Sequence, residues 1–537
     1  MERRNQTVLL IIFSILLLSA CSTNEQKEER LQEEQNEKTL AEIQELAAHG
    51  QILGERWFAG VTEFQEVSES LGEPDQKNRA GNGTYAVYED HDTVIGLTEN
   101  NRVFDLRSSA PDIKKITRAH TEKIVGIPEE VRHIDEQDIL VYELNEEFQL
   151  KFVFLSSDDT ATIDHLSVVH KPSEHIQKNV LGMSLEEKLG QLILMGVQGT
   201  DLDPAAKAFI TEQHVGGIIL FKRNFIDTVQ SLDLINEMKQ ANKSGKAPLL
   251  IGVDEEGGRV TRLPEELVKT PSNRMIGKTA DGDFAFQVGE MLGEKLGSFG
   301  INMDFAPVLD VDSNSKNPVI GDRSYGSDAQ LVGEMGVQQL HGMKSKHVVP
   351  VIKHFPGHGD TSVDSHIDLP VIPHSEERLQ KVELRPFKEA IESGADAVIV
   401  GHLIVEAYDR ENPASFSKSV ITELLREELF FDGVVITDDL VMGAIEKYYS
   451  IGDAAVKSIQ AGGDILLLGH GYTPVNEVLT SLKTAVASGK LTEERINQSV
   501  ERILTLKQTY ELNDELPQKV DVDGLNEQTE ELLLKMK

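Results

Sequence analysis

Short apolar runs alternate with longer amphipathic stretches across residues 192–469. Each run is continuously apolar, as in strands buried on both faces, and the runs recur at roughly 25 to 50 residues, which leaves room for helices between them. Eight strands that alternate with helices predict an α/β fold, a TIM-type (β/α)8 barrel. The predicted strands are residues 192–197, 217–221, 249–254, 301–307, 349–354, 397–402, 433–438 and 464–469.

Residues 51–172 have a different pattern, in which two landmarks recur at the same offset of 54 residues. Gly72-Glu73-Pro74 returns as Gly126-Ile127-Pro128, and Val87-Tyr88-Glu89 returns as Val141-Tyr142-Glu143. A shared offset indicates a duplicated unit, in which a helix and a Gly-x-Pro turn lead into short strands. We expect a smaller N-terminal α+β accessory domain without a catalytic cluster, and its strands at residues 85–89, 93–98, 102–107, 139–144, 148–155 and 162–169.

The first 21 residues have the pattern of an export signal. Arg3 and Arg4 precede an apolar stretch at residues 8–18, which is too short for a comfortable membrane span. The small residues that precede Cys21 resemble a lipobox, so we expect lipidation of Cys21 and an extracytoplasmic protein anchored to the cell membrane. The alternative is a chance cysteine after an ordinary secretory signal. Cys21 is the only cysteine, so the sequence predicts no disulfide.

The chain is strongly acidic, with 90 Asp and Glu residues against 53 Lys and Arg residues and a formal net charge of −37 among 537 residues. This charge speaks against a nucleic-acid partner, because phosphates would be repelled at long range. The predicted domains are a lipoprotein signal peptide at 1–21, a charged tether at 22–50, the accessory domain at 51–172, the barrel at 178–515 and an acidic tail at 516–537.

Polar side chains collect where the predicted barrel strands end, which is where TIM barrels carry their active sites. The set comprises Asp254, Asp310, Asp312, Lys353, His354, His402 and Asp438. The densest stretch is residues 353–366, where two aspartates and three histidines follow an apolar run on a loop rich in Pro and Gly. Titratable groups this dense after a buried strand are costly to fold around and indicate chemistry.

Four segments, at residues 253–262, 321–326, 353–366 and 436–440, together resemble the β-N-acetylhexosaminidase branch of glycoside hydrolase family 3. The resemblance covers about residues 183–509. It implies a retaining exo-β-N-acetylglucosaminidase that removes terminal GlcNAc from peptidoglycan fragments, without a metal or another cofactor.

The resemblance also implies roles for single residues. Asp438 is the expected nucleophile, and His366 is the expected acid/base with Asp364 as its orienting partner. Two residues apart in an extended segment, Asp364 and His366 lie on the same side, so the carboxylate can fix the imidazole tautomer. The implied substrate-binding residues are Asp254, Arg262, Arg323, Lys353 and His354, to which the strand-end position adds His402 as a weaker candidate. Glu255 and Glu256 are expected to support the turn at Gly257-Gly258.

Three alternatives remain at this point. A histidine acid/base does not repel phosphate as a glutamate would, so phosphorolysis could replace hydrolysis. His354, His358, Asp360 and His366 could instead be metal ligands of a metal-dependent hydrolase. The barrel could also bind wall sugars without turnover. The oligomeric state is not determined by the sequence.

Overall fold

The computed structural model describes residues 33, 35–62, 64–80, 83–97, 103–134, 137–145, 147–171, 174–361, 368–429 and 431–536. The chain forms two compact units, one up to Glu174 and the other from His175 onward. Within the described ranges, none of the helices is both long and apolar enough to cross a lipid bilayer. Cys21 and the predicted export signal lie outside these ranges.

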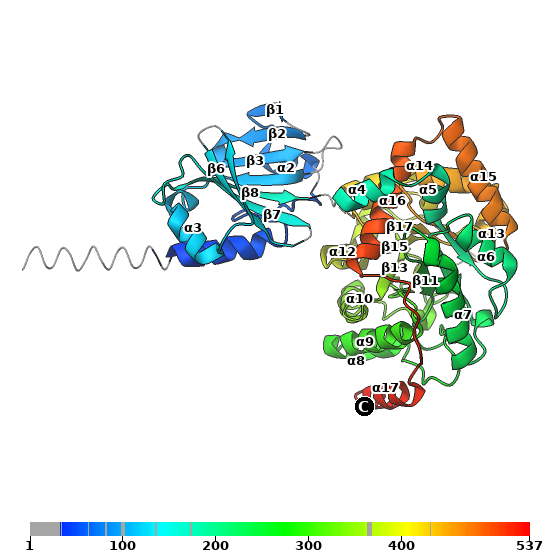
Figure 1. The fold of residues 1–537 in the computed structure, drawn as a ribbon. Helices are drawn as coiled ribbons and strands as arrows, with labels where there is room; N and C mark the ends of the chain where they lie inside the picture. Colours follow the sequence, from blue (N-terminus) through cyan, green and yellow to red (C-terminus); the bar gives the residue numbers. More distant parts are fainter. Residues whose placement is uncertain are drawn as a thin grey trace, which may run out of the picture. The chain divides into compact units, whose positions relative to one another are not determined.

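The first unit is built on one eight-stranded antiparallel sheet with the strand order β1-β2-β3-β4-β8-β7-β6-β5 (Figure 1). Strands β1 to β4 with helix α2 form one copy, strands β5 to β8 with helix α3 form the other, and β4 pairs with β8 where they meet. The bounds are α2 (Phe64–Leu71), β1 (Gln76–Ala80), β2 (Gly83–Tyr88), β3 (Thr93–Leu97), β4 (Val103–Ser108), α3 (Arg118–Val125), β5 (Glu130–Ile134), β6 (Gln137–Glu143), β7 (Phe148–Phe154) and β8 (Ile163–His170).

Equivalent hydrogen bonds in the two copies support the predicted duplication. The Tyr88 hydroxyl donates to the Gly72 carbonyl at 3.2 Å, and the Tyr142 hydroxyl donates to the Gly126 carbonyl at 3.1 Å. All six predicted strands are present. The strands missed by the sequence, β1 and β5, lie at the two sheet edges, and their polar residues give no apolar alternation.

The expectation that residues 22–50 form only a tether is wrong for residues 35–47, which are helical. Leu40, Ile43 and Ala47 are at most 2% exposed and belong to the hydrophobic core of the first unit. Their spacing places them on one helix face, so a single apolar stripe is enough to dock this otherwise charged helix onto the sheet.

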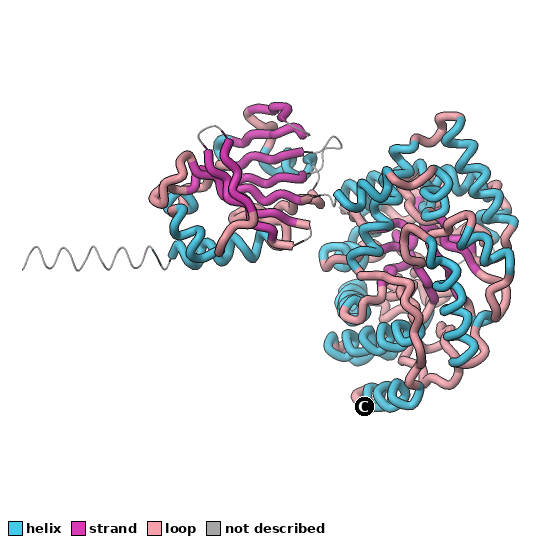
Figure 2. The backbone as a smooth tube through the Cα atoms, in the orientation of Figure 1, coloured by secondary structure: helices cyan, strands magenta, loops and turns pink. Residues whose placement is uncertain are grey.

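The second unit is a closed parallel barrel, and all eight predicted strands are confirmed. The hydrogen-bonded order is β17-β15-β13-β12-β11-β10-β9-β18, and a bridge between Ile436 and Ile465 closes the ring. Figure 2 shows the strands enclosed by helices. The strand bounds are β9 (Ile193–Gly196), β10 (Gly217–Leu220), β11 (Leu250–Val253), β12 (Met303–Asp304), β13 (Val349–Phe355), β15 (Ala397–Val400), β17 (Val434–Thr437) and β18 (Leu466–Leu468), with a separate pair β14 (Val371–Ile372) and β16 (Ile404–Val405).

The barrel strands are buried at every position, which explains their continuously apolar sequences. The surrounding helices are α4 (Glu174–Leu181), α5 (Leu185–Gln191), α6 (Pro204–Thr211), α7 (Thr228–Ala241), α8 (Asn273–Thr279), α9 (Gly282–Phe299), α10 (Ala329–Lys344), α11 (Glu376–Lys381), α12 (Arg385–Glu392), a π-helical segment (Ser419–Glu428), α13 (Gly443–Glu446), α14 (Ile451–Gln460), α15 (Thr473–Ala487), α16 (Glu493–Thr509) and α17 (Val522–Leu534).

The predicted acidic tail at 516–537 contains a helix, α17, and this helix is packed. Leu525 and Leu532 are each 5% exposed. The chain ahead of this helix is fixed to α7, because the Asn236 amide donates to the Pro517 carbonyl at 3.0 Å and the Lys239 ammonium donates to the Asn513 carbonyl at 3.0 Å. Two leucines and these backbone contacts therefore hold the acidic segment against the barrel.

Candidate active site

The carboxyl ends of four barrel strands carry most of the predicted site residues. Asp254 follows β11, Lys353 and His354 lie near the carboxyl end of β13, His402 follows β15, and Asp438 follows β17. In a parallel barrel all these strand ends meet at one mouth, where TIM barrels bind substrate. The structure therefore brings these residues to one end of the barrel. Arg323 ends a short 3₁₀ helix, Gly321–Arg323, in the loop after β12.

A buried network of charges joins four of these side chains. The Lys353 ammonium lies 2.7 Å from a carboxylate oxygen of Asp254 and 2.7 Å from one of Glu256. Arg323 donates two parallel hydrogen bonds to Glu256, at 2.8 and 2.7 Å. Arg262 approaches Asp254 at 3.8 Å. Asp254 and Arg262 keep 20% and 25% of their side chains exposed, so a sugar hydroxyl can reach the network at these two residues.

The network keeps its members charged although burial opposes this. Burial would raise the pKa of Glu256, but the positive charges of Arg323 and Lys353 outweigh it and lower the pKa. Burial would likewise lower the pKa of Lys353, but Asp254 and Glu256 raise it. Glu256 supports the Gly257-Gly258 turn through its backbone N–H, which donates to the Val260 carbonyl at 3.0 Å, whereas its carboxylate binds the two cations.

Glu255 supports the turn region as expected. Its carboxylate accepts a hydrogen bond from the Thr261 hydroxyl and two from the backbone N–H groups of Arg262 and Leu263, at 2.7 and 3.1 Å. The carboxylate is fully buried, and burial raises its pKa. The two consecutive glutamates therefore separate into a loop support, Glu255, and a partner of the site cations, Glu256.

Asp310 holds the loop that follows β13. Its buried carboxylate lies 2.6 Å from His354 Nδ1 and accepts the backbone N–H of His358 at 2.6 Å. Burial would raise the pKa of Asp310, but His354 and His358 lower it. With Nδ1 held by a carboxylate, His354 can present its Nε2 atom to a ligand. The sequence placed Asp310 at a strand end without finding this partner, and it placed Asp312 there too, which instead pairs with Arg274 at 2.5 Å.

His358 lies beside His354 in the loop that follows β13. Its ring packs edge-on against the His354 ring with centroids 5.9 Å apart, and its Nδ1 atom lies 2.7 Å from the Thr361 hydroxyl. Burial and the neighbouring His354 lower the pKa of His358, although the charge of Asp438 acts in the opposite direction. The lowered pKa favours the neutral form of this loop imidazole.

Asp438 and Asp439 form a turn at the end of β17. The Asp438 N–H donates to the Val400 carbonyl at 3.0 Å, and one Asp438 carboxylate oxygen accepts the Asp439 N–H at 2.9 Å. Asp439 accepts the Gly469 N–H at 3.0 Å, in agreement with its expected structural role. The turn thus fixes the Asp438 carboxylate relative to β15.

His402 contacts the backbone of this turn. It is fully buried, its Nδ1 atom is 2.7 Å from the Ser415 hydroxyl, and its Nε2 atom is 3.1 Å from the Asp439 carbonyl. Because both ring nitrogens face protein atoms, we assign His402 a positioning role at the turn in place of the predicted sugar contact. Asp364 and His366 lie outside the described residues, so their relation to Asp438 stays a prediction.

The alternative metal set of His354, His358, Asp360 and His366 finds no support among the described residues. Asp310 holds His354, Thr361 holds His358, and Asp360 pairs with His374 at 2.5 Å. Among the described residues, one group of three His, Asp and Glu residues has its ligand atoms close enough together to hold a metal. This group contains Asp360 but neither His354 nor His358.

A parallel barrel with the Asp438 carboxylate and a network of acids and cations at the same end is the arrangement expected of an enzyme that binds and cleaves polyhydroxylated substrates. The comparison with protein families agrees. Residues 184–506 match the model "Glycosyl hydrolase family 3 N terminal domain", and residues 40–169 match "Domain of unknown function (DUF4309)". The chain belongs to glycoside hydrolase family 3 and is a glycosidase, which confirms the predicted family and enzyme class.

Several relatives share the barrel. A solved glycoside hydrolase family 3 β-N-acetylglucosaminidase from Paenibacillus sp. str. FPU-7 is 42% identical with a TM-score of 0.63, over 65% of this chain and 68% of that one. Beta-hexosaminidase A of Pseudoalteromonas piscicida is 35% identical over 57% of this chain and 56% of its own length. The Beta-hexosaminidase of Nitrosomonas eutropha is 34% identical over 59% of this chain and 92% of its own length.

Proposed function

We propose that the protein is a retaining exo-β-N-acetylglucosaminidase that hydrolyses terminal GlcNAc from peptidoglycan fragments. The observation that carries the proposal is the position of Asp438 at the carboxyl end of β17, at the same end of the barrel as Asp254, Lys353 and His354. The names of the relatives, β-hexosaminidases and a β-N-acetylglucosaminidase, support the sugar.

In this mechanism the Asp438 carboxylate attacks the anomeric carbon and forms a glycosyl-aspartate while the bond to the leaving oxygen breaks. His366 donates a proton to that oxygen and later removes one from the water that releases the sugar, with Asp364 holding the imidazole. The N–H of Asp439 on the Asp438 carboxylate stabilises its anionic form and its orientation.

Recognition of the non-reducing sugar falls to the charge network. The Asp254 carboxylate can accept bonds from two hydroxyls, while Lys353 on one side and Arg262 on the other hold it in place. His354 offers a further polar group, oriented by Asp310. Buried groups that a matching ligand satisfies discriminate strongly against analogues without the right hydroxyls.

Trapping of the intermediate tests the proposal. The protein is incubated with a fluorinated aryl β-GlcNAc analogue that slows deglycosylation, and the peptic peptides are analysed by mass spectrometry. We expect one added sugar on the peptide that contains Asp438, and none in the Asp438→Asn variant. Turnover of the ordinary aryl substrate without a trapped sugar on this peptide would overturn the assigned nucleophile, and no turnover of any aryl β-glycoside would favour the sugar-binding alternative.

The same reaction run in phosphate separates hydrolysis from phosphorolysis. We expect free GlcNAc as the product at all phosphate concentrations. Accumulation of GlcNAc-1-phosphate in proportion to phosphate would identify a phosphorylase.

We also propose that lipidated Cys21 anchors the enzyme to the outer face of the cell membrane, where peptidoglycan fragments are present. Labelling of producing cells with a fatty-acid analogue tests the anchor. The label and membrane association should both be lost in Cys21→Ser, and a membrane-bound, unlabelled wild-type protein would contradict the proposal.

A further inference from the structure

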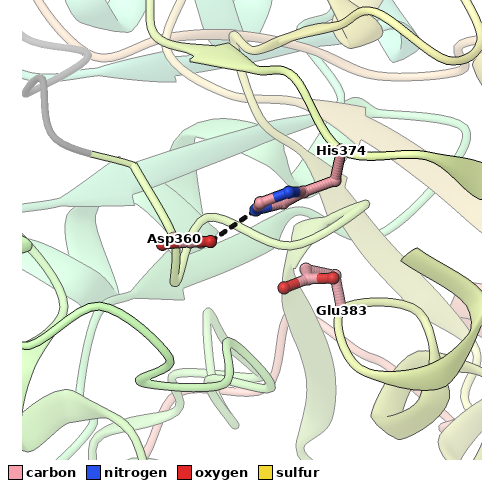
Figure 3. A group of neighbouring side chains, drawn as sticks. All are labelled: Asp360, His374 and Glu383. Atoms are coloured by element: carbon pink, nitrogen blue, oxygen red, sulfur yellow. Dashed lines mark hydrogen bonds and ion pairs between the residues drawn. The ribbon is translucent and has the colours of Figure 1, made fainter. Parts of the chain in front are cut away.

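A second cluster of polar side chains lies beside the loop that follows β13. Figure 3 shows Asp360, His374 and Glu383 turned toward one another. Their ligand atoms, one nitrogen and two carboxylate oxygens, all lie within 4.8 Å of one another. Asp360 follows β13, His374 follows β14, and Glu383 lies between α11 and α12. The three residues therefore converge from separate elements of the barrel.

One residue of the cluster is buried and the other two are partly exposed. The Glu383 side chain is 1% exposed, whereas those of Asp360 and His374 are 21% and 31% exposed. Gly357 packs closely on Glu383, since a Cβ atom added to Gly357 would lie 2.9 Å from the Glu383 Cβ. The backbone of the turn therefore restrains the glutamate. An ion can thus enter past Asp360 and His374 and meet a carboxylate that the fold already holds in place.

The donor set has the chemistry of a transition-metal site. One imidazole with two carboxylates suits Zn²⁺, whereas Mg²⁺ and Ca²⁺ prefer sets made of oxygen alone. His374 Nε2 and Asp360 Oδ2 are 2.5 Å apart, and two ligands of a tetrahedral zinc are separated by about 3.4 Å. A shift of about 1 Å, with the imidazole proton moved to Nδ1, would exchange their hydrogen bond for two bonds to the metal.

One cation already competes for the cluster. Arg378 donates to both carboxylate oxygens of Glu383, at 2.9 and 3.3 Å, and its side chain is 38% exposed. Because Glu383 is buried, Arg378 can leave it only if another cation takes its place, and a bound divalent ion would supply that charge. The two carboxylates of the cluster carry a charge that a divalent ion balances.

We propose that Asp360, His374 and Glu383 bind one Zn²⁺ ion, with water as a fourth ligand. The ion would link the turn after β13 to the segment between β14 and α12, and it takes no part in the proposed glycoside hydrolysis. The proposal is independent of that function, since it concerns residues outside the predicted catalytic and sugar-binding set.

Titration of the full chain with Zn²⁺ tests the site. The protein is first freed of metal by dialysis against a chelator, and affinity is measured by competition with a chromophoric chelator. We expect one strong equivalent in the wild type and at least a tenfold weaker affinity in His374→Ala and in Asp360→Asn, which keeps the side-chain volume. The matched control is His165→Ala, because His165 pairs with Asp164 at 2.8 Å in the accessory domain and belongs to no group of three possible metal ligands among the described residues.

The variant Arg378→Ala makes the test sharper, since removal of the competing cation should tighten Zn²⁺ binding severalfold. Co²⁺ in place of Zn²⁺ should give the intense visible absorption of a tetrahedral site, and this absorption should be weak in His374→Ala. Equal Zn²⁺ affinity in wild type and His374→Ala would overturn the proposal, as would the absence of a strong equivalent in the wild type. Circular dichroism shows whether each variant is folded.

Discussion

Glu256 and Arg323 form a bidentate ion pair at the mouth of the barrel, with hydrogen bonds of 2.8 and 2.7 Å between the guanidinium and the carboxylate. The carboxylate is 1% exposed and also binds Lys353 at 2.7 Å. A buried anion that two cations share fixes the position of both, because neither cation can leave without exposing an unpaired charge. Glu256 thus determines where the Lys353 and Arg323 donors lie.

Replacement of Glu256 by glutamine should impair sugar binding. The amide keeps the volume but leaves Arg323 without its anion and Lys353 with Asp254 alone. We expect kcat/KM for an aryl β-GlcNAc to fall about 100-fold, which corresponds to about 2.7 kcal/mol. Steady-state kinetics and thermal unfolding measure the effect. Glu377→Gln is the control, since Glu377 forms an exposed pair with Lys381 and should change neither quantity. A Glu256→Gln variant with wild-type kinetics would show that the network is not part of the site.

Loss of His366 should depend on the leaving group. If His366 is the general acid, His366→Ala should slow hydrolysis of GlcNAc disaccharides by about 10²- to 10⁴-fold and hydrolysis of an activated aryl GlcNAc far less, since a good leaving group needs no proton. Asp364→Ala should also slow hydrolysis of the disaccharides more than that of the activated aryl GlcNAc, but by smaller factors. An equal loss with both substrates would argue against the acid role.

Asp464 should make the folding stability of the protein depend on pH. This carboxylate is fully buried at the start of β18, where Arg426 donates to it at 2.6 Å. Burial would raise its pKa, but the surrounding arginines lower it. A pKa lower in the folded than in the unfolded chain contributes stability that is present above the unfolded value of about 4 and is lost as pH falls toward the folded value.

The Asp464→Asn variant should therefore unfold more easily at pH 7, by about 3 kcal/mol or more, and the difference from wild type should shrink below pH 4. Urea unfolding between pH 3 and pH 7 measures this. Asp233→Asn, at an exposed position on α7, is the control. A difference that stays constant with pH would contradict the assigned ionic role.

Because the accessory domain is duplicated, substitutions at equivalent positions of its two copies should lower its stability equally. Tyr88→Phe and Tyr142→Phe each remove one hydrogen bond to a glycine carbonyl and should each cost about 1 kcal/mol. The chain has one tryptophan, Trp57, which is buried in this domain, so its fluorescence reports the unfolding of this unit alone. Clearly unequal losses would show that the two copies are not energetically equivalent.

The sequence by itself determined the elements of the barrel and the strand ends that carry polar residues. Burial on both faces imposes a continuous apolar pattern on each strand, and this pattern is local, so the eight strands could be found without knowledge of their partners. Asp254, Lys353 and Asp438 followed directly, because the residue after a barrel strand lies at the mouth. The specific roles of these residues came from motif resemblance.

The tertiary structure alone decided the partners. Glu256 and Arg323 are 67 residues apart, and Asp310 and His354 are 44 residues apart, so no local pattern relates them. Likewise, the helix at residues 35–47 has too few apolar positions to be stable alone and is held by the sheet it packs on. Which charge neutralises which, and which sparse stripe is buried, depend on contacts that exist only once the chain has folded.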